Sequence, residues 1–125
     1  MPTHAFILPM LTLYGIPHCG TCKKAIAWLN DHNIPHTFIN VKTDPPNAEL
    51  ITTWVGQLGN KPLRNTSGQS YRALGPERQD WSDGQWIAAF AADAMLLKRP
   101  IFIKDGVAVL TGFRKSEADL LALLS

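Results

Sequence analysis

The chain has 125 residues, of which 46% are hydrophobic and 18% charged, so one packed core is expected and intrinsic disorder is excluded. Twelve basic and ten acidic side chains give a formal net charge of +2, too small and too evenly spread to indicate a nucleic-acid or membrane partner. No apolar run approaches the roughly 20 residues that a membrane-spanning helix needs.

The predicted elements begin with an alternating, β-prone strand at residues 11–16. A tight loop leads from it into a helix from about residue 21 to residue 32, and a second strand covers residues 36–41. Strand, helix and strand within about 30 residues are typical of a right-handed βαβ unit. The predicted helix places four apolar side chains on one face: Cys22, Ala25, Ile26 and Leu29.

Two further helices are predicted in the middle of the chain. The first opens at Asp44-Pro45-Pro46, because proline is tolerated in the first turn of a helix. The second is capped by Asp83 and carries apolar residues as far as Leu97. We expect Trp54 and Trp86, one from each helix, to be core residues.

The C-terminal part is predicted to form a hairpin and a closing helix. Asp105-Gly106 lies between two short β-prone runs and is a strong signal for a two-residue hairpin turn. Ser116 and Asp119 resemble a capping box ahead of a leucine-rich segment. The order of elements predicts an α/β, thioredoxin-like fold with a helical insertion, at about residues 44–97, between its βαβ and ββα halves.

The feature that carries chemistry is Cys19-Gly20-Thr21-Cys22, at the predicted junction of a strand and a helix N-terminus. Unpaired backbone N–H groups and the positive end of the helix dipole favour a thiolate there, and they also favour a bound oxyanion. Cys19 precedes the helix and is expected to be the exposed nucleophile. Cys22, one turn in, is placed to resolve a mixed disulfide on Cys19. Lys23 and Lys24 oppose the dipole, which makes sense if the site holds negative charge.

Two other interpretations of the cysteines stay open. They could be two small buried residues, since free cysteine is often buried. They could also bind zinc, because a C-x2-C-x9-H-x3-H pattern joins them to His32 and His36. Its central spacer is shorter than the roughly 12 residues of a zinc finger, and Pro35 should break a helix carrying both histidines. We therefore expect no metal.

The chain contains only these two cysteines, and no second pair exists for a disulfide framework. In so short a chain this pattern indicates a reducing compartment. Residues 1–9 contain no Lys or Arg and no Ala-x-Ala cleavage site, so they are a poor signal peptide. We therefore expect a cytoplasmic protein, and we expect it to be a monomer.

Three motifs together make the sequence resemble the glutathione-linked arsenate reductase (ArsC) family: Cys19-Gly20-Thr21-Cys22, Lys98-Arg99-Pro100-Ile101 and Gly112-Phe113-Arg114. That family also includes the Spx-type redox regulators and the YffB-type thiol reductases, and Leu13-Tyr14-Gly15-Ile16 looks most like the YffB branch. The resemblance runs from about Met10 to the C-terminus. Residues 10–125 are therefore expected to form a single domain, and residues 1–9 to be an over-called start or a disordered extension.

The resemblance implies a site in which a loop cysteine and three arginines hold a tetrahedral oxyanion, whose geometry the planar guanidinium fork matches. Cys19 matches the nucleophile, and Gly20 and Thr21 belong to the substrate-binding end of the helix. Arg99 matches the second arginine. Pro100 matches the cis-proline that faces the thiol loop.

The other two arginine positions differ in how well they match the family. Arg114 matches the third arginine. Arg64 lies in the segment of the first arginine, with Thr66 or Ser67 as the alternative for that position. Gly15 stands where arsenate reductases have a histidine, which argues against a straightforward arsenate reductase.

The resemblance implies a glutathione-linked thiol reductase in which the Cys19 thiolate attacks arsenate or a glutathione mixed disulfide. Glutathione is expected as co-substrate and glutaredoxin as a recycling partner, and no bound cofactor is expected. The alternative is an Spx-type regulator that binds RNA polymerase and uses a Cys19–Cys22 disulfide as a switch. The segment around Arg114 favours the reductase.

Overall fold

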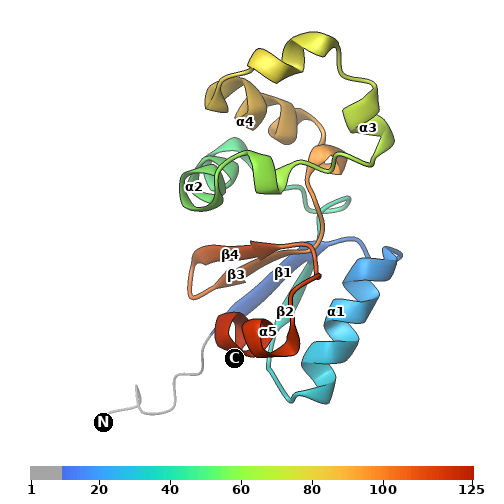
Figure 1. Cartoon of the computed structure of the whole chain (residues 1–125), viewed down its shortest axis with the longest axis vertical. Helices are drawn as coiled ribbons and strands as arrows, with labels where there is room; N and C mark the ends of the chain where they lie inside the picture. The colour runs from blue at the N-terminus through green and yellow to red at the C-terminus, as the bar shows by residue number, and fades with distance from the viewer. Residues whose placement is uncertain (1–9) are drawn as a thin grey trace.

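A four-stranded mixed sheet is the base of the structure, a computed structural model that describes residues 10–125 (Figure 1). The strands are β1 (Leu11–Gly15), β2 (Thr37–Asn40), β3 (Ile101–Lys104) and β4 (Val107–Thr111). Their order across the sheet is β2-β1-β3-β4. β1 pairs in parallel with β2 and antiparallel with β3, and β3 pairs antiparallel with β4. The extension expected at residues 1–9 lies outside the described residues.

Two helices cover one face of this sheet, α1 (Gly20–Asp31) and α5 (Glu117–Leu124) (Figure 1). Strands and helices contribute together to the core on this face: Leu11, Leu13, Ala25, Leu29, Phe102, Leu110, Leu120 and Leu124. The apolar face predicted for α1 is confirmed: Cys22, Ala25 and Leu29 are fully buried, and the partly buried Ile26 packs against the same core.

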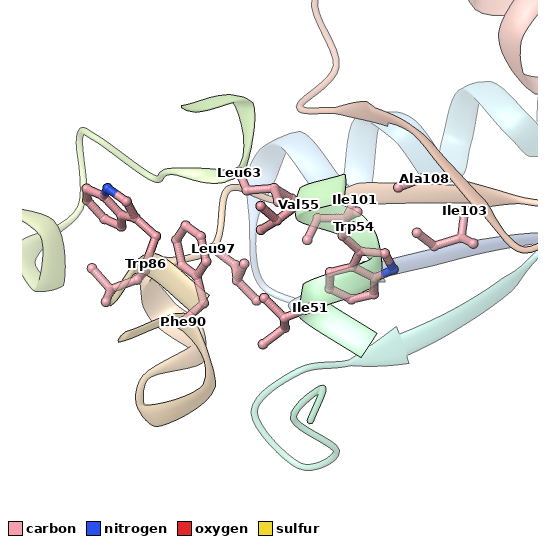
Figure 2. Close-up of a cluster of buried hydrophobic side chains, with 11 residues drawn as sticks. Ile51, Trp54, Val55, Leu63, Trp86, Phe90, Leu97, Ile101, Ile103 and Ala108 are labelled. Carbon is pink, nitrogen blue, oxygen red and sulfur yellow. The ribbon is translucent and has the colours of Figure 1, made fainter. Parts of the chain in front are cut away.

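The helices between β2 and β3 form a second layer on the opposite side of the sheet, in which the first of them lies nearest the strands and the others lie beyond it (Figure 1). They are α2 (Ala48–Leu58), α3 (Gln69–Arg72) and α4 (Asp83–Ala92), joined by short 3-10 turns. β3 sends Ile101 and Ile103 into this layer and Phe102 into the other, because alternate residues of a strand face opposite ways. Figure 2 shows the resulting core, in which Trp54 and Trp86 are buried as predicted. The structure therefore has the predicted thioredoxin-like fold with a helical insertion.

The second helix starts later than predicted. α2 begins at Ala48, after Asp44-Pro45-Pro46, because the Asn47 side chain accepts a hydrogen bond from the Leu50 N–H at 2.8 Å and caps the helix there. The prolines therefore lie in the connection from β2 and not in the first helical turn.

The third predicted helix, which corresponds to α4, ends earlier than predicted. α4 stops at Ala92, and Leu97 lies beyond it, because the Asp93 side chain accepts the Met95 N–H at 2.9 Å and starts a separate 3-10 turn. Its N-cap is Ser82, one residue before the predicted cap. With these bounds, no helix in the described part of the chain is long and apolar enough to cross a bilayer.

The hairpin turn is confirmed, and the capping box is confirmed only in its Ser116 half. Asp105 and Gly106 have φ values of 51° and 83°, which are the left-handed conformations that a two-residue type I′ hairpin turn requires. The Ser116 side chain accepts the Asp119 N–H at 3.3 Å and caps α5. Local sequence signals are strong at both places, and the structure follows them.

Candidate functional site

Cys19 ends the loop that connects β1 to α1 and is the N-cap residue of the helix. Its backbone is extended, with φ −75° and ψ 125°. Its N–H donates to the Ile16 carbonyl at 3.1 Å, and its carbonyl accepts the Lys23 N–H at 3.0 Å, so the residue is fixed on both sides. The half-buried side chain lies at the first helical turn, where backbone N–H groups have no partner within the helix.

The surroundings of Cys19 favour the thiolate. Partial burial acts to raise the pKa of this thiol, but hydrogen bonds from the Cys22 N–H, the Cys22 thiol and the Thr21 N–H outweigh it. The positive charge of Arg99 acts in the same direction, and the pKa of Cys19 falls below its ordinary value of 9.0. A larger fraction of Cys19 is therefore thiolate near neutral pH than of a free cysteine.

Cys22 has the opposite character. Its side chain is completely buried in the first turn of α1, against Gly15 of β1. Burial is the main reason that the pKa of Cys22 rises to about 11, and the negative charge of a neighbouring Cys19 thiolate adds to the effect. Cys22 therefore stays protonated and donates its hydrogen to the Cys19 sulfur. The two free thiols differ in exposure and acidity, as a nucleophile and a resolving thiol would.

Arg99 and Pro100 reach the site from the segment that precedes β3. The Arg99–Pro100 peptide bond is cis, the conformation that the family resemblance implies for this proline. Arg99 Nη1 donates to the carbonyls of Met95 at 3.2 Å and Leu97 at 3.0 Å. These two bonds hold the guanidinium in place, where its charge acts on both thiols.

A short backbone bridge brings a loop of the helical insertion to the same site. The Asn65 N–H donates to the Leu96 carbonyl at 2.8 Å, and the Lys98 N–H donates to the Leu63 carbonyl at 2.8 Å. The bridge lies immediately before Asn65-Thr66-Ser67 in one segment and before Arg99 in the other. The insertion therefore contributes polar residues next to the thiol loop.

These elements surround an open cavity of about 750 Å³. Four of the predicted site residues line it: Cys19, Thr21, Arg99 and Arg114. The rest of the lining consists of Lys24, Asn65, Thr66, Ser67, Lys98, Gly112 and Phe113. The volume falls within the roughly 300–1,000 Å³ that is common for small-molecule sites. Gly20, Cys22 and Pro100, which were also predicted, do not belong to the lining, and Cys22 is buried behind Cys19.

The cavity carries positive charge. Four cationic side chains line it: Lys24, Lys98, Arg99 and Arg114. Within residues 10–125, no Asp or Glu belongs to the lining, and the one ion pair found there, between His32 and Glu117, involves none of these cations. A lining of this composition attracts negatively charged ligands.

Arg64, which was predicted to bind substrate, is turned away from the cavity in this structure. Its guanidinium carbon lies 4.1 Å from the centroid of the Trp86 ring, and its Nη2 donates to Asn60 Oδ1. Both partners belong to the helical insertion, and Arg64 does not line the cavity. A guanidinium stacks favourably on the face of a buried indole, which explains why this arginine turns inward. Thr66 and Ser67, the alternative for this position, do line the cavity.

Sequence reasoning missed Lys98 and Asn65 as site residues and gave Lys24 no contact with substrate. Lys24 could have been found from the helical period, since it follows Thr21 by three residues and shares its face of α1. Lys98 adjoins Arg99 in a quoted motif, and Asn65 adjoins Thr66. Lys98 and Asn65 could therefore have been found because each is next in sequence to a residue already predicted to belong to the site.

The histidines make contacts that differ from zinc ligation. His32 Nδ1 lies 2.8 Å from the Trp28 carbonyl oxygen, and His32 Nε2 lies 3.0 Å from Glu117 Oε1. His36 Nδ1 lies 2.9 Å from the Ile34 carbonyl oxygen. Among the described residues, no three His, Cys, Asp or Glu side chains come together as a metal site would need.

Comparisons with known proteins agree with the motifs. Residues 14–120 match the ArsC family. A structure described as a possible arsenate reductase from Streptococcus mutans UA159 is 41% identical, with a TM-score of 0.81, and the match covers 90% of this chain and 98% of that one. The structure of a YffB protein matches with 28% identity and a TM-score of 0.81, over 92% of this chain and 99% of that one.

A regulator is also similar. Global transcriptional regulator Spx 2 of Lactococcus lactis subsp. lactis is 32% identical over 114 residues, which is 86% of this chain and 83% of its own. The family match spans both the thiol loop and the Arg99 and Arg114 segments. Arsenate-reductase-like structures among these similar proteins support a redox enzyme in general terms. The resemblance inferred from three motifs is confirmed: the chain belongs to the ArsC family.

Proposed function

We propose that this protein is a glutathione-linked thiol reductase in which the Cys19 thiolate attacks a glutathione mixed disulfide or an oxyanion such as arsenate. The observation that carries the proposal is a thiol of lowered pKa at a cavity lined by four cations. The thiol supplies a nucleophile near neutral pH, and the cations attract an anionic substrate. Two free cysteines suit the reducing cytoplasm, where we place the protein.

With a mixed disulfide, the reaction has two steps. The Cys19 sulfur bonds to the glutathione sulfur while the S–S bond breaks, and the released thiolate carries away the electron pair and takes a proton from water. A second glutathione or Cys22 then attacks the Cys19–glutathione disulfide. The first route releases oxidised glutathione, and the second leaves a Cys19–Cys22 disulfide for glutaredoxin or glutathione to reduce. Because Cys22 is buried with a pKa of about 11, we expect the glutathione route to dominate at neutral pH.

The size and composition of the cavity favour the mixed disulfide over arsenate. A single tetrahedral oxyanion would fill only a small part of a cavity of about 750 Å³, whereas a tripeptide with two carboxylates would use much more of it. Arg64 is turned into the helical insertion, so only Arg99 and Arg114 remain of the arginines that an oxyanion site would use. We therefore place glutathione ahead of arsenate as the ligand.

A side-by-side turnover assay tests this proposal. Arsenate and a glutathionylated peptide are each offered with glutathione and glutaredoxin to the wild type, Cys19→Ser and Cys22→Ser. We expect turnover of the mixed disulfide that is lost in Cys19→Ser and kept in Cys22→Ser. Equal and complete loss in both variants would contradict the division of roles, and turnover of arsenate alone would contradict the preferred substrate.

The second candidate is an Spx-type regulator that binds RNA polymerase. The 32% identity to Spx 2 of Lactococcus lactis and the C-x-x-C pair favour it. In that case Cys19 and Cys22 would form a disulfide switch. Retention of RNA polymerase that depends on the oxidation state of the pair, with no turnover of either substrate, would support the regulator over the reductase.

A further inference from the structure

Two lysines from distant parts of the chain line the cavity beside Cys19. Lys24 belongs to α1, and Lys98 belongs to the segment that leads into β3. Both side chains are exposed, and in the described part of the chain neither has a carboxylate partner. Arg99, by contrast, already donates to two backbone carbonyls. The ammonium donors of both lysines are therefore available to a ligand, whereas Nη1 of Arg99 is already engaged.

Lys24 is placed where a cation costs helix stability. It lies close to the N-terminus of α1, whose dipole is positive there, and the first turn of the helix contains no acidic residue to compensate. Its spacing of three residues from Thr21 puts both on the cavity face of the helix. Lys23, the next residue on the same helix, is equally exposed but does not line the cavity.

Lys98 is held over a glycine. A Cβ added to Gly112 would lie 3.0 Å from Lys98 Cε, so the lysine side chain would have to give way by a few tenths of an ångström. Gly112 also has φ of 73°, a conformation that glycine adopts easily, and its N–H donates to the Pro100 carbonyl at 2.8 Å. The backbone of Lys98 is fixed by the bond from its own N–H to the Leu63 carbonyl.

We propose that Lys24 and Lys98 form a carboxylate-binding subsite that makes Cys19 select anionic, low-molecular-weight disulfides over neutral ones. This inference rests on the proposed thiol chemistry of Cys19. In the reaction concerned, the Cys19 thiolate bonds to one sulfur of the disulfide, the S–S bond breaks, and the other half leaves as a thiolate. The lysines take no part in that exchange and act only on the charged groups that the disulfide carries.

Single-turnover attack on four substrates tests the subsite. Reduced protein is mixed with one of four disulfides. Glutathione disulfide carries carboxylates and peptide bonds, and dithiodipropionate carries carboxylates alone. 2-Hydroxyethyl disulfide is uncharged, and cystamine is positively charged. The second-order rate constants are compared as ratios to that of 2-hydroxyethyl disulfide. The variants are Lys24→Gln/Lys98→Gln and the matched control Lys23→Gln/Lys61→Gln, which removes the same charge from exposed lysines outside the cavity.

In the wild type, the anionic disulfides should react faster than the neutral one and cystamine slowest. In Lys24→Gln/Lys98→Gln the ratio for glutathione disulfide should fall about fivefold to tenfold, as expected for the loss of two exposed charge pairs. In the control pair the ratio should stay close to the wild-type value. If the ratio for dithiodipropionate falls equally, any carboxylate on the disulfide is recognised. If only the ratio for glutathione disulfide falls, the carboxylates are recognised as they are placed in the tripeptide.

The possible failures are distinguishable. If the wild type attacks none of the four disulfides, the proposed function fails and the subsite with it. If the wild type attacks them but the ratios are unchanged in Lys24→Gln/Lys98→Gln, the subsite alone is overturned. An equal fall in both double variants would overturn it too, because that result would show a general effect of net charge.

Discussion

The sulfur of Cys22 occupies the space that a side chain on Gly15 would need. An ideal Cβ on Gly15 would lie 2.5 Å from Cys22 Sγ and 3.2 Å from a ring carbon of Phe38. The size of the side chain that β1 can carry at position 15 is therefore limited by Cys22. This contact gives Gly15 a role in this chain, at the position where arsenate reductases have a histidine.

Gly15→Ala should destabilise the protein by about 1–3 kcal/mol, because the added methyl group overpacks a closed space. The free energy of unfolding in denaturant measures the loss. In a Cys22→Ala background the nearest contact with residue 22 relaxes to 3.6 Å, so the cost of Gly15→Ala should shrink. An equal cost in both backgrounds would show that Cys22 is not what requires the glycine.

Cys22 and Arg99 should both lower the pKa of Cys19. Cys22→Ala removes the hydrogen bond from the Cys22 thiol, and Arg99→Gln removes a positive charge, so each should shift the alkylation of Cys19 to higher pH. The shift should be larger for Cys22→Ala, since the hydrogen bond contributes more than the charge. The pH dependence of iodoacetamide labelling, followed by intact mass, measures the midpoint. An unchanged or lower midpoint in both variants would contradict this account of Cys19.

Arg64 and Arg114 should behave oppositely when each is changed to Gln. Arg64→Gln loses its contact with Trp86 and its bond to Asn60, so the free energy of unfolding should fall by about 1–2 kcal/mol while KM stays unchanged. Arg114→Gln lies on the exposed cavity wall, so KM should rise with little change in stability. Denaturant unfolding and steady-state kinetics on the glutathionylated peptide give both quantities. A rise in KM for Arg64→Gln with intact stability would restore its predicted role in binding.

His32 should make the stability of the α1–α5 contact depend on pH. Its two ring nitrogens face the Trp28 carbonyl and the Glu117 carboxylate, which only accept, so these partners favour the protonated ring, which carries hydrogen on both nitrogens. The Trp28 carbonyl, followed by Glu117, raises the pKa of His32 above its ordinary value of 6.5. A raised pKa in the folded state means that the contribution is complete below the unfolded value and is lost as pH rises through the folded value.

The melting temperatures of the wild type and Glu117→Gln, taken from about pH 5.5 to pH 8.5, test this contact. The melting temperature of the wild type should exceed that of Glu117→Gln at the acidic end, and the difference should shrink with rising pH as His32 loses its proton. Asp119→Asn is a control, since Asp119 is also an exposed acid of the first turn of α5 but has no contact with His32. A difference in melting temperature that grows with pH would have the wrong sign and would exclude a stabilising contact between protonated His32 and Glu117.

The sequence predicts what local chemistry controls. Strand alternation gave β1, the Asp105-Gly106 pair gave the hairpin turn, and Ser116 gave the start of α5, because each signal acts within a few residues. The thiol loop belongs to the same class. Cys19 lies at a helix N-terminus because a strand, a short loop and an amphipathic helix follow one another in the sequence.

The sequence does not predict what tertiary contacts decide. Arg64 could have faced the cavity or the insertion, and the choice depends on Trp86, which lies 22 residues further along the chain. Lys98 reaches the cavity because Gly112 leaves room for it, and this pairing joins the two ends of a hairpin.

Trapping of the first covalent step tests most directly whether the Cys19 thiolate is the nucleophile. Reduced Cys22→Ser protein is mixed with glutathione disulfide near neutral pH, and the adduct is followed by intact mass and located by peptide mapping. We expect a single glutathione adduct on Cys19, reversed by dithiothreitol and formed faster than on a cysteine-containing peptide at the same pH. An adduct that forms no faster than on that peptide, or no adduct at all, would contradict it.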